Sequence, residues 1–217
     1  MTSGDAEGLA LVGSIVPVSR ETSERLTVYA RLLRQWQSRI NLVAPSTLDE
    51  LWARHIADSV QSFTLAQDAR RWIDLGSGAG FPGLVVAMLM AEGSKGRVDL
   101  IESNGKKCAF LRTVVRESGL KAAGVDVEVH NGRIEQVLGD LLEPDVVSAR
   151  ALAPLEKLLE FTHGVLSGDA IGLFSKGREH GEELARAALR WDFDVDSTPS
   201  RLGDQSVLLK ISNVRAK

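Results

Sequence analysis

The chain has 217 residues, of which 44% are hydrophobic and 25% are charged, as in an ordinary globular protein with one sizeable core. A net charge of −3 and a pI of about 5.9 exclude a protein that coats nucleic acid through bulk charge, so RNA binding would require a local basic patch. The single cysteine, Cys108, excludes an intrachain disulfide and a zinc site built from cysteines, and it fits a reducing compartment. No signal peptide or membrane span is indicated, so the expectation is a cytoplasmic monomer.

The first forty residues are expected to begin loosely and then form a helix. Residues 1–19 contain many small residues and are predicted to be partly loose at the start. Residues 20–40 are predicted to form an amphipathic helix, because apolar side chains recur at spacings of three and four. The apolar stripe consists of Leu26, Tyr29, Leu33, Trp36 and Ile40. Five arginines on the same segment form either a solvated face or a surface that contacts RNA phosphates, and the sequence leaves both interpretations open.

A second helix is predicted to begin near Ser46, with Asp49 three residues later in an arrangement like a capping box. Helical spacing places His55 and Ser59 on or near the buried face of this helix. A lone histidine on such a face is more often a hydrogen-bonded core residue than a catalyst. Because both helices precede the first strand, residues 1–69 are predicted to form a helical cap on a core of residues 70–217.

From residue 71 onward, strands and helices alternate. Strands are expected at 72–75, 97–102, 125–129, 145–150, 170–175, 191–198 and 205–211. The loop between the last two strands is short, which allows an antiparallel hairpin but not a parallel crossover. The predicted fold class is therefore α/β, with a mostly parallel seven-stranded sheet that ends in an antiparallel hairpin. This layout is usual for the Rossmann-like class I methyltransferases that depend on S-adenosyl-L-methionine (AdoMet).

The segment Trp72–Gly83 reads as a strand, a glycine turn and the start of a helix. Gly76, Gly78 and Gly80 lack Cβ, so the backbone can turn sharply there and approach a ligand closely. The glycine spacing fits the dinucleotide fingerprint and also the glycine turn of AdoMet-dependent methyltransferases. A tight turn without a ligand is the third interpretation.

Two carboxylates bear on the choice between these ligands. Glu102 ends the next strand, 19 residues after Gly83, and can accept hydrogen bonds from both ribose hydroxyls of an adenosine. NAD and AdoMet both contain adenosine, so Glu102 does not distinguish them. Asp74 stands just before the glycines, where a carboxylate repels a pyrophosphate but can hold the water or ammonium around a methionine amino group. Asp74 therefore favours AdoMet.

The ends of the fourth and fifth strands add two cations, Arg150 and Lys176, to the same edge of the sheet. No group of His, Cys and Asp has metal-ligand spacing, so no metal is predicted. Ser148–Ala151 lacks the Asn/Asp-Pro-Pro-aromatic run used to methylate exocyclic amino groups. Guanine N7 has a free lone pair and needs no general base, so catalysis of its methylation depends on orientation. Arg150 or Lys176 can hydrogen-bond guanine O6, a phosphate or the cofactor carboxylate, although each can also be an ordinary exposed cation.

Four segments together resemble a known family. They are Arg54–Ser59, Asp74–Gly83, Ser148–Ala151 and Lys176–Gly177, and the resemblance extends from about residue 20 to residue 211. The sequence resembles the ribosomal small-subunit RNA methyltransferase G family, also called glucose-inhibited division protein B. The resemblance implies a cytoplasmic bacterial enzyme that uses AdoMet to methylate N7 of guanine 527 in the decoding-centre loop of 16S rRNA. The substrate would be the small ribosomal subunit or its precursor.

Carried over position by position, the resemblance implies cofactor contacts at Gly76 and Phe81, and at Ile134 and Glu135 beside the adenine. It also matches Arg150 to an arginine at the active-site edge. The complete predicted cofactor site is Asp74, Gly76, Gly78, Gly80, Phe81, Glu102, Ile134, Glu135 and Arg150. The predicted catalytic residues are Arg150 and Lys176.

Two other functions stay open on the sequence alone. An NAD-dependent oxidoreductase is favoured by the glycine spacing, but the terminal hairpin and the lack of a Ser-Tyr-Lys set oppose it. A non-catalytic RNA-binding module on the same fold is favoured by the arginine-rich first helix.

Overall fold

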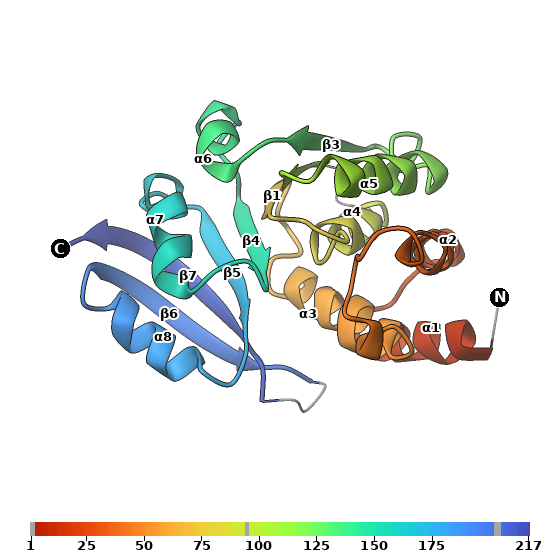
Figure 1. Cartoon of the computed structure of the whole chain (residues 1–217), viewed down its shortest axis with the longest axis horizontal. Helices are drawn as coiled ribbons and strands as arrows, with labels where there is room; N and C mark the ends of the chain where they lie inside the picture. Colours follow the sequence, from red (N-terminus) through yellow and green to blue (C-terminus); the bar gives the residue numbers. More distant parts are fainter. Residues whose placement is uncertain (1–2, 94–95, 202–204) are drawn as a thin grey trace.

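The structure, a computed structural model, describes residues 3–93, 96–201 and 205–217. A twisted sheet forms the centre of the molecule, with helices on both faces (Figure 1). Its strands are β1 (Arg71–Leu75), β2 (Gly96–Glu102), β3 (Val125–Asn131), β4 (Val146–Arg150), β5 (Ile171–Lys176), β6 (Trp191–Pro199) and β7 (Val207–Ala216). The helices that follow the first strand are α4 (Gly83–Met90), α5 (Gly105–Glu117), α6 (Ile134–Val137), η3 (Leu138–Asp140), α7 (Leu155–Leu166) and α8 (His180–Ala187).

The strand order is β3-β2-β1-β4-β5-β7-β6. Strands β1 to β5 are parallel, and β7 runs antiparallel to both β5 and β6. The short connection between β6 and β7 forces this reversal, because a parallel crossover needs a dozen residues or more. The predicted α/β class, with a seven-stranded sheet and a terminal hairpin, is therefore confirmed.

The two faces of the sheet bury separate hydrophobic clusters. Side chains along β1 alternate between them: Trp72 belongs to one cluster, whereas Ile73 and Leu75 belong to the other. The first cluster lies under α4, α5 and the N-terminal helices, and the second lies under α6, α7 and α8. Within the three described ranges, no helix has the length and apolar character that a membrane crossing requires.

The N-terminal segment corrects one prediction. Ser3–Ile15 forms the helix α1 instead of a loose start, while residues 1–2 lie outside the described residues. Asp5 explains the order, because its buried carboxylate accepts hydrogen bonds from Arg34 at 2.8 Å and from the Trp52 indole at 3.0 Å. A charge-assisted contact to a distant helix fixes a segment that local composition leaves free.

The prediction of a second helix from Ser46 is also corrected. The segment forms three elements: η1 (Pro45–Thr47), the π-helix η2 (Leu51–Ala57) and α3 (Asp58–Thr64). Ser46 lies inside η1 and does not begin the long helix, which starts at Leu51. The helix that precedes these pieces, α2 (Arg20–Gln37), agrees with the predicted apolar stripe, with Leu26, Tyr29 and Leu33 fully buried.

Candidate functional site

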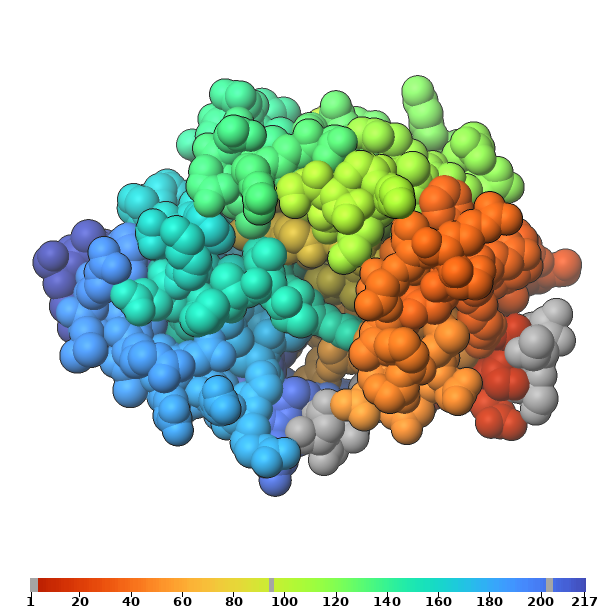
Figure 2. Space-filling model, in the orientation of Figure 1, coloured from red at the N-terminus to blue at the C-terminus, as the bar shows by residue number. Residues whose placement is uncertain are grey.

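The glycine turn and Arg150 lie where the strand order reverses. Leu75, at the end of β1, pairs with Ile101 of β2 on one side and with Ala149 of β4 on the other. The carboxyl edge at such a switch point is where open α/β sheets bind ligands. Figure 2 shows a recess in this region, between the orange N-terminal helices and the blue C-terminal part of the chain.

The glycine turn needs glycine for two different reasons. Gly76, Gly78 and Gly80 have φ of +62°, +54° and +97°, a left-handed backbone that other residues adopt at a cost. A Cβ on Gly78 would meet only the Gly76 carbonyl, at 3.6 Å, so open space lies in front of it. A Cβ on Gly76 would instead collide with Leu152, at 2.5 Å. Gly78 therefore offers the open backbone surface that a ligand needs.

Glu102 braces this turn. One of its carboxylate oxygens accepts the Gly78 N–H at 2.9 Å, and the other accepts the Asn104 N–H at 2.7 Å. A carboxylate has about four acceptor positions, so two stay available. Glu102 can thus hold the turn and still accept hydrogen bonds from two ribose hydroxyls.

Asp74 is fully buried behind the turn. Its Oδ1 accepts a hydrogen bond from the Ser148 hydroxyl at 2.7 Å, and that hydroxyl oxygen accepts one from the Trp72 indole at 2.8 Å. Burial raises the pKa of Asp74 to about 6, although hydrogen bonding by Ser148, Ser77 and the Gly83 backbone opposes the rise. In the part of the chain that the structure describes, Oδ2 makes no well-formed hydrogen bond. Oδ2 lies beside Gly83 at the start of α4, and the Gly83 backbone helps to stabilise the ionised carboxylate.

The N-terminal helices hold the glycine turn from its other side. The Tyr29 hydroxyl donates to the Ala79 carbonyl at 2.6 Å, and its ring lies 5.3 Å from the ring of Phe81. The imidazole of His55 stacks on the same Phe81 ring, with 5.1 Å between the ring centroids. The turn is therefore fixed by residues from α2 and η2, as well as by the sheet.

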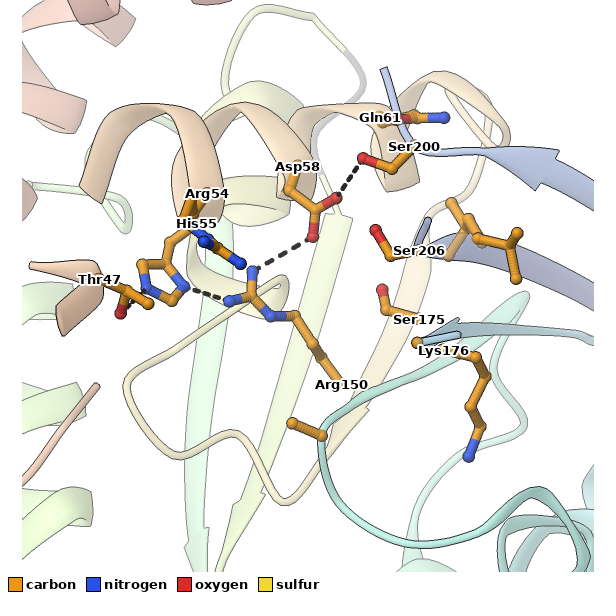
Figure 3. Close-up of a pocket in the computed structure, with 14 residues that line it drawn as sticks. Thr47, Arg54, His55, Asp58, Gln61, Arg150, Ser175, Lys176, Ser200 and Ser206 are labelled. Carbon is orange, nitrogen blue, oxygen red and sulfur yellow. Dashed lines mark hydrogen bonds and ion pairs between the residues drawn. The ribbon is translucent and has the colours of Figure 1, made fainter. Parts of the chain in front are cut away.

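Arg150 ends β4 and reaches across the edge of the sheet toward η2 and α3 (Figure 3). Its guanidinium contacts Nδ1 of His55, lies 3.3 Å from the Asp58 carboxylate and sits over the Phe81 ring at 5.4 Å. Arg150, His55 and Asp58 border a cavity of about 300 Å³. The structure thus joins Arg150 to two members of the Arg54–Ser59 segment, which sequence reasoning did not connect to it.

Lys176 lies at the end of β5, but its side chain points away from Arg150 (Figure 3). The ammonium donates to the Ala153 carbonyl at 2.6 Å and to the Glu183 carboxylate at 2.8 Å. Glu183 also accepts the Leu155 N–H at 2.6 Å, so the pair ties down the loop between β4 and α7. The catalytic role of Lys176 stays a prediction, and it would require this ion pair to open.

Replacing Lys176 with Met is expected to lower the free energy of unfolding by about 3–5 kcal/mol, because Glu183 is left largely buried without its partner. Urea denaturation measures the change. The matched control is Lys157→Met, which breaks an exposed pair with Glu160 and is expected to cost about 1 kcal/mol or less. Equal costs for the two variants would contradict the assignment of Lys176 as a structural tie.

Ile134 and Glu135 begin α6, with Ile134 buried and Glu135 exposed. Both border a hollow of about 920 Å³ between α6 and the end of α7, and neither is among the residues around the cavity at Arg150. Their predicted place beside the adenine stays a prediction.

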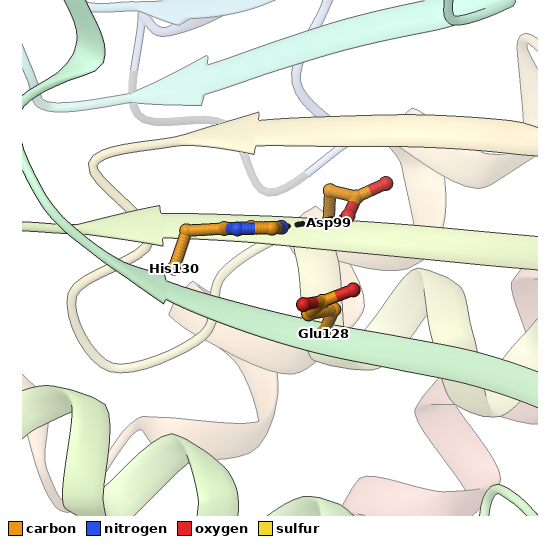
Figure 4. A group of neighbouring side chains, drawn as sticks. All are labelled: Asp99, Glu128 and His130. Atoms are coloured by element: carbon orange, nitrogen blue, oxygen red, sulfur yellow. Dashed lines mark hydrogen bonds and ion pairs between the residues drawn. The ribbon is translucent and has the colours of Figure 1, made fainter. Parts of the chain in front are cut away.

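The structure also assembles a group of ligand-type side chains that sequence spacing did not reveal. Asp99 of β2 lies beside Glu128 and His130 of β3 (Figure 4), with ligand atoms within 4.8 Å of one another. Arg97 already pairs with both carboxylates, at 2.8 Å from Asp99 and in contact with Glu128. The group is therefore an ion-pair network across two strands. The sequence feature that could have indicated this network is the presence of charged residues at alternate positions of two neighbouring strands.

The arginine-rich face of α2 is partly engaged within the chain. Arg34 pairs with the buried Asp5 at 2.8 Å, and Arg20 pairs with Glu24 at 2.8 Å. Arg31 contacts Gln35 at 3.4 Å. A role for this face in phosphate contact stays a hypothesis.

Similarity to known proteins decides between the interpretations of the glycine turn. The family described as rRNA small subunit methyltransferase G (GidB) matches residues 22–205. Relatives from Brucella ovis and Brucella abortus, each named ribosomal RNA small subunit methyltransferase G, are 49% identical over 208 residues. The match covers 94% of this chain and 94% of each relative.

The chain belongs to the rRNA small subunit methyltransferase G family.

Solved structures agree with the methyltransferase fold. An SAH-bound methyltransferase from Podospora anserina has a TM-score of 0.58 and 18% identity, with 91% of this chain and 97% of that chain covered. An O-methyltransferase from Bacillus cereus in complex with SAH has a TM-score of 0.57 and 15% identity, with 95% and 97% covered. The predicted methyltransferase G family and class I fold are both confirmed, and the dinucleotide interpretation loses its support.

Proposed function

We propose that this member of the methyltransferase G family binds AdoMet at the glycine turn and methylates N7 of guanine 527 in 16S rRNA. The substrate is the small ribosomal subunit or its precursor, and the protein acts as a monomer in the cytoplasm. Family membership supports the cofactor and the substrate class. The observation that supports the proposed site most strongly is the Arg150 guanidinium over Phe81 of the glycine turn, beside a cavity that the ends of β4 and β5 border.

The residues around the turn fit AdoMet. The backbone at Gly78 faces open space, and Glu102 keeps two acceptor positions for ribose hydroxyls. Asp74 supplies a buried carboxylate behind the turn, whose negative charge suits the ammonium of a methionine group or a water bound to it. When bound, AdoMet supplies a methyl group on a positively charged sulfur, and transfer to N7 leaves the electron pair of the broken bond on that sulfur.

Methylation at N7 requires the protein to orient the base but requires no proton transfer. The N7 lone pair lies in the plane of the base and carries no proton that a side chain has to remove. We assign Arg150 the task of hydrogen-bonding guanine O6, next to N7, because a planar guanidinium fixes the plane of the group it binds. The main contribution of the protein is then to align guanine N7 with the methyl group of AdoMet.

Cofactor affinity is expected to fall below about pH 6. The ionised form of Asp74 is the one that attracts an ammonium group, and its pKa is raised to about 6 in the free protein. Acidification protonates Asp74 before binding, so affinity decreases by up to about tenfold per pH unit below 6 until the lower pKa of the complex is reached. Calorimetry from pH 7.5 to about pH 5 measures this slope. Asp74→Asn is expected to bind more weakly at pH 7.5 and to lack the slope; an unchanged slope would assign it to another group.

A methylation assay tests the proposed function. The protein is incubated with AdoMet carrying a labelled methyl group and with small ribosomal subunits that lack the modification, and the RNA is then digested to nucleosides. Label in 7-methylguanosine is the expected result. Label in another nucleoside would retain the cofactor but contradict the N7 assignment.

A further inference from the structure

The segment Arg54–Ser59 is one of the four segments that carry the family resemblance, yet the proposed chemistry assigns it no task. It covers the end of the π-helix η2 and the first turn of α3. A π turn is rare and occurs frequently at functional sites, because its extra residue changes the direction of the side chains around it. Here it directs one imidazole and one carboxylate to the same partner.

That partner is Arg150. One terminal nitrogen of the guanidinium contacts Nδ1 of His55, and the other lies 3.3 Å from the Asp58 carboxylate. Each of these residues is itself held in place. His55 Nε2 lies 2.8 Å from the Thr47 hydroxyl, and Asp58 accepts a hydrogen bond from the Ser200 hydroxyl at 3.4 Å. The guanidinium is thus fixed from two sides (Figure 3).

The hydrogen bonding also defines the state of His55. A guanidinium only donates, so Nδ1 has to be the acceptor, and Nε2 then carries the proton and donates to Thr47. Burial and the positive charges of Arg150 and Arg54 lower the pKa of His55 to about 3. His55 is therefore neutral at any working pH, and its only lone pair is already used. Such an imidazole cannot serve as a general base.

We propose that His55 and Asp58 are positioning residues that orient the Arg150 guanidinium toward the guanine. The proposal rests on the proposed function of Arg150 in methyl transfer. Among the described residues, two of the five N–H donors of Arg150 make these contacts, so three are available to the RNA. The stacking of His55 on Phe81 also ties the orientation of Arg150 to the glycine turn, where the cofactor is proposed to bind.

Two variants of His55 separate positioning from other roles. In His55→Asn, the side-chain amide oxygen occupies the place of Nδ1 and can still accept from Arg150, whereas His55→Leu has no acceptor. We expect kcat to fall about 100-fold in His55→Leu, because a small misplacement at a reacting centre has an effect of this size. In His55→Asn we expect kcat within about fivefold of wild type. The affinity for AdoMet is expected to stay within about twofold in both variants. Thermal melting is the control, since both variants lose the same stack on Phe81.

An NMR readout does not depend on activity. In protein labelled with ¹⁵N-arginine, an ordered guanidinium gives resolved signals for its terminal N–H groups. We expect the Arg150 signals in wild type and in His55→Asn, and their loss in His55→Leu. Equal signals and equal kcat in all three proteins would overturn the proposal. It would also be overturned if His55→Asn kept the Arg150 signals but was as inactive as His55→Leu. Should wild type make no 7-methylguanosine, the proposed function fails, while the NMR comparison still decides whether His55 orients Arg150.

Discussion

Gly78→Asp is expected to reduce the affinity for AdoMet by at least about 100-fold, which corresponds to roughly 2.7 kcal/mol. The new side chain would enter the open space in front of the turn, where a Cβ meets nothing closer than 3.6 Å. Its carboxylate would also stand beside Glu102, which accepts the Gly78 N–H at 2.9 Å. Both effects oppose binding of the ribose at this point.

Gly119→Asp is the matched control for this variant. Gly119 has a left-handed φ of +64°, close to the +54° of Gly78, and a Cβ there meets no atom within 4 Å. It follows α5, away from the glycine turn. Calorimetry should therefore show near-normal affinity in Gly119→Asp. Normal affinity in Gly78→Asp would remove the glycine turn as the cofactor site.

Arg150→Met is expected to lower kcat for methylation by about 10²–10³-fold, because the guanine loses the group that orients it. The affinity for AdoMet is expected to change less than tenfold, since the carboxylates of Asp74 and Glu102 stay in place. Arg150→Lys is expected to recover little, because an ammonium keeps the charge but cannot bridge His55 and Asp58 in one plane.

Arg97→Met provides the control for lost stability. Arg97 is also a partly buried arginine held by carboxylates, but it lies near the start of β2, where it pairs with Asp99 of β2 and Glu128 of β3. Single-turnover methylation of all variants, with melting temperatures alongside, makes the comparison. A kcat in Arg150→Met no lower than in Arg97→Met would contradict a direct role for Arg150.

The fold could be predicted from the sequence because its main signals are local. Apolar periodicity located the seven strands, and the short connection between β6 and β7 required the antiparallel hairpin. Asp74, Glu102 and Arg150 lie at or near the carboxyl ends of their strands. Because these strands are parallel, their carboxyl ends share one edge of the sheet, so the location of the three residues could be predicted.

The features that escaped prediction depend on contacts between distant residues. The helix α1 is fixed by Asp5 through Arg34 and Trp52, far away in the sequence. The direction of Lys176 depends on Glu183 from α8. A histidine in the position of His55 is more often a hydrogen-bonded core residue than a catalyst. The structure buries it in contact with Thr47 and Arg150, but no spacing rule connects it to the end of β4.

Locating the methyl group on the RNA tests the proposed N7 methylation most directly. Small subunits that lack the modification are treated with protein and AdoMet, the 16S rRNA is cut with a nuclease, and the fragments are sequenced by mass spectrometry. We predict one added methyl group, on N7 of guanine 527, and none after treatment with Arg150→Met for the same time under single-turnover conditions. A methyl group on another nucleotide, or on another atom of that guanine, would contradict it.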